Sequence, residues 1–115
     1  MSPTTQFRLR IYRDGGIAVG PGKVALVEAI AATGSISAAA RSMGMSYRRA
    51  WLLVDELNRA LKEPAVVGTV GGRRGGGATV TAAGSELVRR YRAIERAART
   101  AAARDIAALN RMLVD

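Results

Sequence analysis

The chain has 115 residues, of which 49% are apolar, and its 18 basic and nine acidic side chains give a net charge of +9. This length allows one compact domain of ordinary size, or a small domain with an extension, and the apolar content excludes a disordered tail. The sequence contains no cysteine and no histidine, which excludes disulfides, zinc fingers, thiol nucleophiles and imidazole acid–base catalysis.

The basic excess consists almost entirely of arginine, with 16 arginines among the 18 basic residues. The planar guanidinium group binds phosphates and guanine edges at two points, so this composition favours a nucleic-acid partner over a merely solubilising surface. The sequence has no long uncharged apolar run and no signal-peptide pattern. We therefore expect a cytoplasmic protein without a membrane partner.

The first predicted element is a strand over residues 7–13, FRLRIYR, in which apolar and basic side chains alternate. Alternation with a period of two is typical of a half-buried strand. The sequence DGG at 14–16 favours a turn, and residues 17–19 would form the returning strand of a hairpin. Residues 1–19 are thus expected to form an N-terminal strand or hairpin.

Two helices are predicted to follow this hairpin. Pro21 opens the first helix and Gly34 ends it, and its apolar side chains recur at helical spacing: Val24, Val27, Ile30 and Ala31. Either Ser35 or Ser37 caps the second helix, which is about two turns long. Its apolar side chains fall one helical turn apart: Ile36, Ala39, Ala40 and Met43.

A third helix is predicted after a sharp reversal at Gly44. Ser46 caps this helix, which runs from Tyr47 to about Lys62 and ends before Pro64. At roughly 100° per residue, its buried face comprises Tyr47, Ala50, Leu53, Val54, Leu57 and Leu61. The opposite face comprises Arg48, Leu52, Asp55 and Arg59, with Arg49 and Trp51 on the flanks. The third helix therefore presents basic residues outward near its N-terminus.

Residues 65–81 are predicted to form two short strands around the sequence GGRRGGG at 71–77, from which Arg73 and Arg74 would project. A short helix, a glycine-bearing turn and a helix with a basic outer face form a helix-turn-helix, and a β-hairpin with a basic tip makes it winged. Residues 20–81 are thus predicted to form a winged helix-turn-helix domain. Its recognition helix, residues 46–62, would enter the major groove by its N-terminal turn.

Residues 82–115 are predicted to form one long helix. Its apolar residues step by three or four positions and stay on one face: Leu87, Tyr91, Ile94, Ala98, Ala102, Ile106, Leu109 and Leu113. Some thirty residues span roughly 45 Å, which is more than a small domain needs. We expect this stripe to bind a second copy of the chain in a homodimer. The alternative is that the helix folds back over the first helix.

The predicted fold class is therefore mainly α with a small β component. Two stretches, GSISAAARSMGMSYRRAW at 34–51 and GGRRGGGATVTAAG at 71–84, resemble the DNA-binding half of the ModE-type family of molybdate-responsive transcription regulators. They are more distantly similar to the N-terminal domains of LysR-type regulators. The resemblance covers about residues 20–97. It implies a winged-helix dimer that binds a near-palindromic site on double-stranded DNA.

The resemblance also assigns roles to individual residues. Ser46, Tyr47 and Arg48 match recognition-helix positions, Trp51 matches a characteristic tryptophan of the family, and Arg73 matches a basic residue of the wing. Members of the family carry a second region of small β-barrels that binds molybdate, and this sequence ends before such a region could begin. We therefore do not expect this chain to bind molybdate, and we expect no other cofactor. The sequence is either a naturally short relative or a shortened form.

Eight residues are the candidates for DNA contact: Ser35, Ser46, Tyr47, Arg48, Arg49, Trp51, Arg73 and Arg74. Arg48 is expected to read a base edge, whereas Arg49 lies nearer to a phosphate. For Tyr47, burial and phosphate contact are evenly balanced, and for Trp51 packing is favoured over contact. The outward Leu52 would touch either a thymine methyl group or a neighbouring subunit.

Other functions receive less support from the sequence. A basic winged helix can also coat DNA without sequence preference, or bind RNA, so a nucleoid-associated or RNA-binding protein is the main alternative. A module that binds only proteins would need an outer face without affinity for phosphate. Catalysis is disfavoured because GGRRGGG lacks the Gly-Lys-Ser/Thr ending of a nucleotide-binding loop, and no pair of carboxylates stands out.

Overall fold

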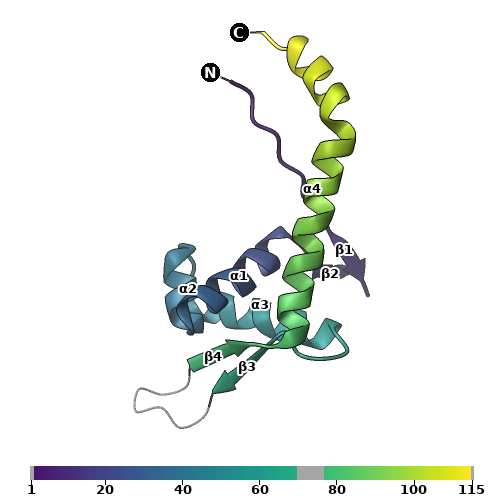
Figure 1. The fold of residues 1–115 in the computed structure, drawn as a ribbon. Helices are drawn as coiled ribbons and strands as arrows, with labels where there is room; N and C mark the ends of the chain where they lie inside the picture. The colour runs from purple at the N-terminus through teal and green to yellow at the C-terminus, as the bar shows by residue number, and fades with distance from the viewer. Residues whose placement is uncertain (1, 70–76, 115) are drawn as a thin grey trace.

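The computed structural model describes residues 2–69 and 77–114. Figure 1 shows a small helical domain from which one long helix extends. In chain order the elements are β1 (Ile11–Arg13), β2 (Gly16–Val19), α1 (Pro21–Thr33), α2 (Ile36–Ser42), α3 (Tyr47–Ala60), β3 (Val66–Thr69), β4 (Gly77–Val80) and α4 (Ala82–Arg111). The predicted fold class, mainly helical with two small β-hairpins and a long C-terminal helix, is confirmed.

The core of the domain consists of aliphatic side chains and alanine. Val24, Leu26 and Ile30 of α1 are fully buried. The helical spacing had placed Ala31 rather than Leu26 on the buried face, but Ala31 is exposed. Where α2 meets α3, the buried residues include Ala39 and Ala50. Their small side chains let the two helices approach closely, so the short α2 fixes the direction of α3.

Local capping explains where the three helices begin and end. Gly34 adopts φ 73° and its N–H donates to the carbonyl of Ile30 at 2.7 Å, which ends α1. Ser35, rather than Ser37, caps α2 by accepting the N–H of Ala38 at 3.1 Å. Ser46 caps α3 in the same way, through the N–H of Arg49. α3 ends at Ala60, two residues before the predicted end.

The N-terminal hairpin is shorter than predicted. β1 covers only Ile11–Arg13 and pairs antiparallel with β2. The tight turn between them has positive φ at Asp14 and Gly15. Residues 2–10 have no strand partner, because the whole of β2, from Gly16 to Val19, already pairs with β1. They run as an extended segment instead, and Ile11, predicted to be half-buried, is exposed.

One cation is buried beside this hairpin, which the sequence did not indicate. Lys23, in the first turn of α1, is 7% exposed. Its ammonium group donates to the carbonyl of Ile17 and lies 3.7 Å from a carboxylate oxygen of Glu56 on α3. These partners compensate for the loss of water around the charge and join β2, α1 and α3.

The second hairpin, β3–β4, is attached to the end of α3 and to the start of α4. Its register pairs Val66 with Val80, and the Asn58 side chain donates to the carbonyl of Val66 at 3.0 Å. A Cβ atom at Gly84 would lie 2.3 Å from the carbonyl oxygen of Ala65. Only glycine therefore allows the chain before β3 to cross so close to the first turn of α4.

The helix α4 packs on the domain with its first half and extends away from it with its second half (Figure 1). Leu87 and Val88 pack against the core, and Tyr91 is 2% exposed. Farther along, Ile94 is 49% exposed and Leu109 is 62% exposed. The alternative to the dimer, in which the helix folds back over α1, thus holds only for the first half.

Within residues 2–69 and 77–114, no single helix is long and apolar enough to cross a membrane; α1 and α2 meet that test only as a pair bent by 118°.

Candidate nucleic-acid interface

The outer face of α3 carries two exposed arginines, Arg48 near its start and Arg59 near its end. The helix buries Ala50, Val54 and Leu57 and turns Arg48 and Leu52 outward, as the helical periodicity predicted. Because Arg48 lies in the first turn, its guanidinium group projects from the end of α3 that carries the partial positive charge of the helix dipole. An anion that approaches this end meets both charges.

Two aromatic residues of α3 lie on the surface, although packing was favoured for Trp51 and was one of two balanced possibilities for Tyr47. Tyr47 is 56% exposed, although the helical wheel assigned it to the buried face, and Trp51 is 47% exposed. A helical wheel gives the direction in which a side chain points, but it does not show how far the segments that pack against the helix extend. Within the described residues, no segment covers the first turn of α3 on this side. Both rings are therefore accessible to a ligand.

Tyr47 and Trp51 line a cleft on one flank of α3, which we call the wing-side cleft. It has a volume of about 410 Å³ and lies between α3, the start of α2 and the β3–β4 hairpin. Ser35 also lines this cleft, but its hydroxyl already caps α2 and lies 3.1 Å from that of Ser37. The structure thus brings together three of the predicted contact residues, Ser35, Tyr47 and Trp51.

Arg49 lines a separate cleft on the other flank of α3, which we call the arginine-side cleft. Its volume is about 480 Å³, and Arg8 and Arg10 of the N-terminal segment also line it. The sequence indicated these two arginines only as the polar side of a strand. Periodicity cannot show that a segment packs beside a helix some forty residues later, so their proximity to α3 was missed.

The remaining candidates are less well defined. Ser46 is exposed, and its hydroxyl accepts the N–H of Arg49 as the cap of α3. Arg73 and Arg74 lie outside the described residues, so their contact with DNA stays a prediction. Leu52 is exposed on the outer face, and the choice between a thymine methyl group and a neighbouring subunit remains open.

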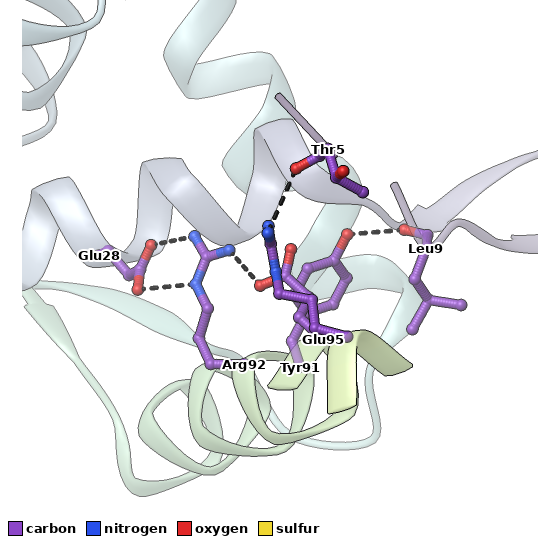
Figure 2. A network of polar contacts seen from close by, with 7 residues as sticks. Thr5, Leu9, Glu28, Tyr91, Arg92 and Glu95 are labelled. Atoms are coloured by element: carbon purple, nitrogen blue, oxygen red, sulfur yellow. Dashed lines mark hydrogen bonds and ion pairs between the residues drawn. The ribbon is translucent and has the colours of Figure 1, made fainter. Parts of the chain in front are cut away.

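Three arginines of α4, namely Arg89, Arg90 and Arg92, form ion pairs within the molecule. Arg92 donates to both carboxylate oxygens of Glu28 on α1, at 2.5 and 3.1 Å, and to Glu95 at 2.6 Å (Figure 2). These hydrogen bonds raise the pKa of Arg92 above its ordinary value, and the bonds to Glu28 have the largest effect. Hydrogen bonds from Arg90 and Arg89 lower the pKa of Glu86.

Four arginines at or beside the first turn of α3 have no such partners. Among the described residues, no carboxylate lies within 4.0 Å of the guanidinium nitrogens of Arg8, Arg10, Arg48 or Arg49. Their charge is therefore available to an external anion, whereas that of Arg92 is largely neutralised inside the molecule. The described part of the chain contains no group of three acidic residues placed to hold a metal ion.

Comparisons with known proteins agree with this geometry. The family described as bacterial regulatory helix-turn-helix protein, lysR family, matches residues 22–85. The chain is 50% identical over 80 residues to the molybdenum-pterin-binding protein MopB of Rhodobacter capsulatus, which covers 70% of this chain and 30% of that protein. It is 41% identical over 88 residues to the molybdenum transport protein ModE of Azotobacter vinelandii, covering 76% and 33%.

The name of a third relative states what that relative does. The DNA-binding transcriptional dual regulator ModE of Escherichia coli K12 is 33% identical over 88 residues, which cover 76% of this chain and 31% of that protein. The chain thus spans about a third of the length of these curated relatives.

Proposed function

Because this chain belongs to the LysR-type family of bacterial helix-turn-helix proteins and is of the ModE type, we propose that it is a sequence-specific, DNA-binding transcriptional regulator. The observation that carries the proposal is the outer face of α3. There, Arg48 stands in the first turn without an acidic partner among the described residues, and a cleft runs along each flank.

The dimensions of α3 suit the major groove of DNA. A helix with its side chains is about 10–12 Å wide, and the major groove is about 12 Å wide. In this position Arg48 faces the base edges, where its two-point hydrogen bonding suits guanine, and Arg49 faces a phosphate. Tyr47 and Trp51, exposed in the wing-side cleft, lie beside the other phosphate backbone.

The test is a selection experiment followed by competition. The full chain selects binding sites from a pool of randomised duplexes, and the enriched duplex then competes with random DNA. We expect a shared motif, and we expect the complex with the enriched duplex to survive a large excess of random DNA. No enrichment, or complete loss of the complex, would favour the alternative of a protein that coats DNA or binds RNA through charge alone.

We also propose that the regulator is a homodimer joined through α4. Ile94 and Leu109 are exposed on the helix that extends beyond the domain, and a second copy would cover them. A two-fold axis through this contact would present two recognition helices to successive major grooves, about 34 Å apart. This arrangement requires a near-palindromic motif in the selection experiment.

Location and effector follow from the same proposal. A regulator that binds bacterial DNA acts in the cytoplasm, which is the location we expect. The names of MopB and ModE refer to molybdenum, but we keep the expectation that this chain itself does not bind molybdate. Equilibrium dialysis of the chain against molybdate tests this expectation directly.

A further inference from the structure

The arginine-side cleft carries more positive charge than the proposed role of α3 requires. It is lined by Arg8, Arg10, Lys23 and Arg49, and by one acidic residue, Glu56. Lys23 and Glu56 lie 3.7 Å apart and largely neutralise one another. The three arginines remain, without carboxylate partners in the described part of the chain. Three uncompensated guanidinium groups around one cavity indicate an anionic ligand.

The two clefts lie on opposite flanks of the same helix. On α3, the arginine-side cleft is lined by Arg49, Leu53 and Glu56, which lie at i, i+4 and i+7 on one flank. The wing-side cleft is lined by residues of α3 such as Tyr47 and Trp51. At about 100° per residue, the two sets lie about 180° apart around the helix axis, and Arg48 lies between them on the outer face.

This arrangement matches the surroundings of a helix in the major groove. Such a helix has one sugar–phosphate backbone on each side, because the groove is about as wide as the helix with its side chains. The wing-side cleft would face one backbone and the arginine-side cleft the other. We infer that Arg8 and Arg10 of the N-terminal segment, together with Arg49, bind phosphates of the second backbone, an inference that rests on the proposed DNA-binding function.

The N-terminal segment is fixed in the position that this contact needs. The hydroxyl of Tyr91 donates to the carbonyl of Leu9 at 2.8 Å, and Leu9 packs against the core (Figure 2). Arg99 donates to the carbonyl of Thr5 at 3.2 Å. Because Arg8 and Arg10 flank the anchored Leu9 and both are exposed, little backbone entropy is lost when they bind a phosphate.

The inference is tested with a double variant, Arg8→Ala with Arg10→Ala, and a matched control, Arg89→Ala with Arg90→Ala. The control removes the same charge from two exposed arginines on α4 that pair with Glu86. Binding to the enriched duplex and to random duplex is measured by fluorescence anisotropy over a series of KCl concentrations. Circular dichroism and thermal melting establish that each variant folds like the parent chain.

For the Arg8 and Arg10 variant, the plot of log K against log salt should lose about two units of slope, roughly one per phosphate contact. Affinity at 0.1 M salt should fall by about tenfold or more for both duplexes, with an unchanged preference for the enriched one. The control should keep the slope of the parent chain. Replacing both residues by lysine, which retains the charge, should restore most of the slope.

The inference is overturned if the Arg8 and Arg10 variant has the same slope as the control. That result would leave the proposed function intact, provided that the parent chain still prefers the enriched duplex. Conversely, a parent chain without sequence preference would overturn the proposed function, while a loss of two units of slope would still support phosphate contact by these arginines. A parent chain that binds no duplex would overturn both.

Discussion

The hydroxyl group of Tyr91 and the carbonyl group of Leu9, 82 positions apart in the chain, are joined by a hydrogen bond of 2.8 Å. Tyr91 is the one aromatic residue of α4 and is almost completely buried. Through this bond, the long helix holds the N-terminal segment beside the domain. The N-terminal segment and the first half of α4 are therefore coupled.

Replacing Tyr91 by phenylalanine should destabilise the protein by about 1–2 kcal/mol, because the carbonyl of Leu9 loses its donor while the ring still fills its site. Urea denaturation of the two proteins measures the difference. Tyr12→Phe is the matched control, since Tyr12 is 65% exposed and should change the free energy of unfolding by less than about 0.5 kcal/mol. Equal effects of the two substitutions would contradict the role of this hydrogen bond.

The same contact predicts a pH dependence. Burial, in the first place, raises the pKa of Tyr91 above its ordinary value of 10.0. The folded protein therefore holds this proton more tightly than the unfolded chain does. The stabilisation is fully present below pH 10 and is lost as the pH rises through the folded pKa. The difference in unfolding free energy between the parent chain and Tyr91→Phe should be constant at pH 7–9 and should shrink above pH 10.

Arg48→Ala should weaken binding to the enriched duplex by about 1–3 kcal/mol and relax base preference at one position, because its guanidinium group faces the base edges. Repeating the selection with the variant measures the preference. Arg59→Ala is the control: Arg59 lies near the other end of α3 and pairs with Asp55 at 3.0 Å. An unchanged motif for Arg48→Ala would exclude base reading by this residue.

Arg73→Ala and Arg74→Ala should weaken binding to all duplexes alike, since a wing that contacts phosphates reads no sequence. The salt dependence of binding should become less steep by about one unit for each phosphate contact that is lost. If either substitution instead changes the selected motif, the wing reads bases in the minor groove.

Leu109→Glu should dissociate the proposed dimer, because it places a charge in the apolar stripe of α4. The two copies together would lose the burial of two leucine side chains, which corresponds to a dissociation constant about a hundredfold higher. Ala107→Glu puts the same charge on an exposed position about 160° from Leu109 around the helix and should leave association unchanged. Sedimentation equilibrium measures both variants, and a parent chain that is monomeric at micromolar concentration would refute the dimer.

Local signals explain most of what the sequence predicted correctly. Ser46 and Gly34 act through hydrogen bonds to residues three or four positions away, so their sequence context is sufficient to place the ends of helices. The alternation of Phe7 and Leu9 with arginines was also meaningful, because these two apolar side chains are half-buried and the arginines are exposed. The predicted partner strand, however, was wrong for this part of the segment.

The errors and omissions arose where distant segments meet. The exposure of Tyr47 depends on which segments pack against the first turn of α3, and the burial of Lys23 depends on the approach of β2 and α3. Neither is encoded in the spacing of residues along one helix. The arginine-side cleft combines the N-terminal segment with α3, and nothing in the local pattern of Arg8 or Arg10 relates them to Arg49.

The ion pairs of Arg92 with Glu28 and Glu95 have a mechanical consequence. The pair with Glu28 clamps α4 to α1 near the base of the long helix, while Glu95 holds the Arg92 side chain from the next turn of α4. The part of α4 beyond this clamp behaves as a lever arm whose direction is set there. From Arg92 to Arg111 the helix is about 28 Å long, so a rotation of roughly 5° at the clamp would displace the far tip by roughly 2.5 Å. In a two-fold assembly, a change in these few bonds would thus alter the distance between the two recognition helices. The spacing of the two DNA half-sites that the dimer can bind would change with it.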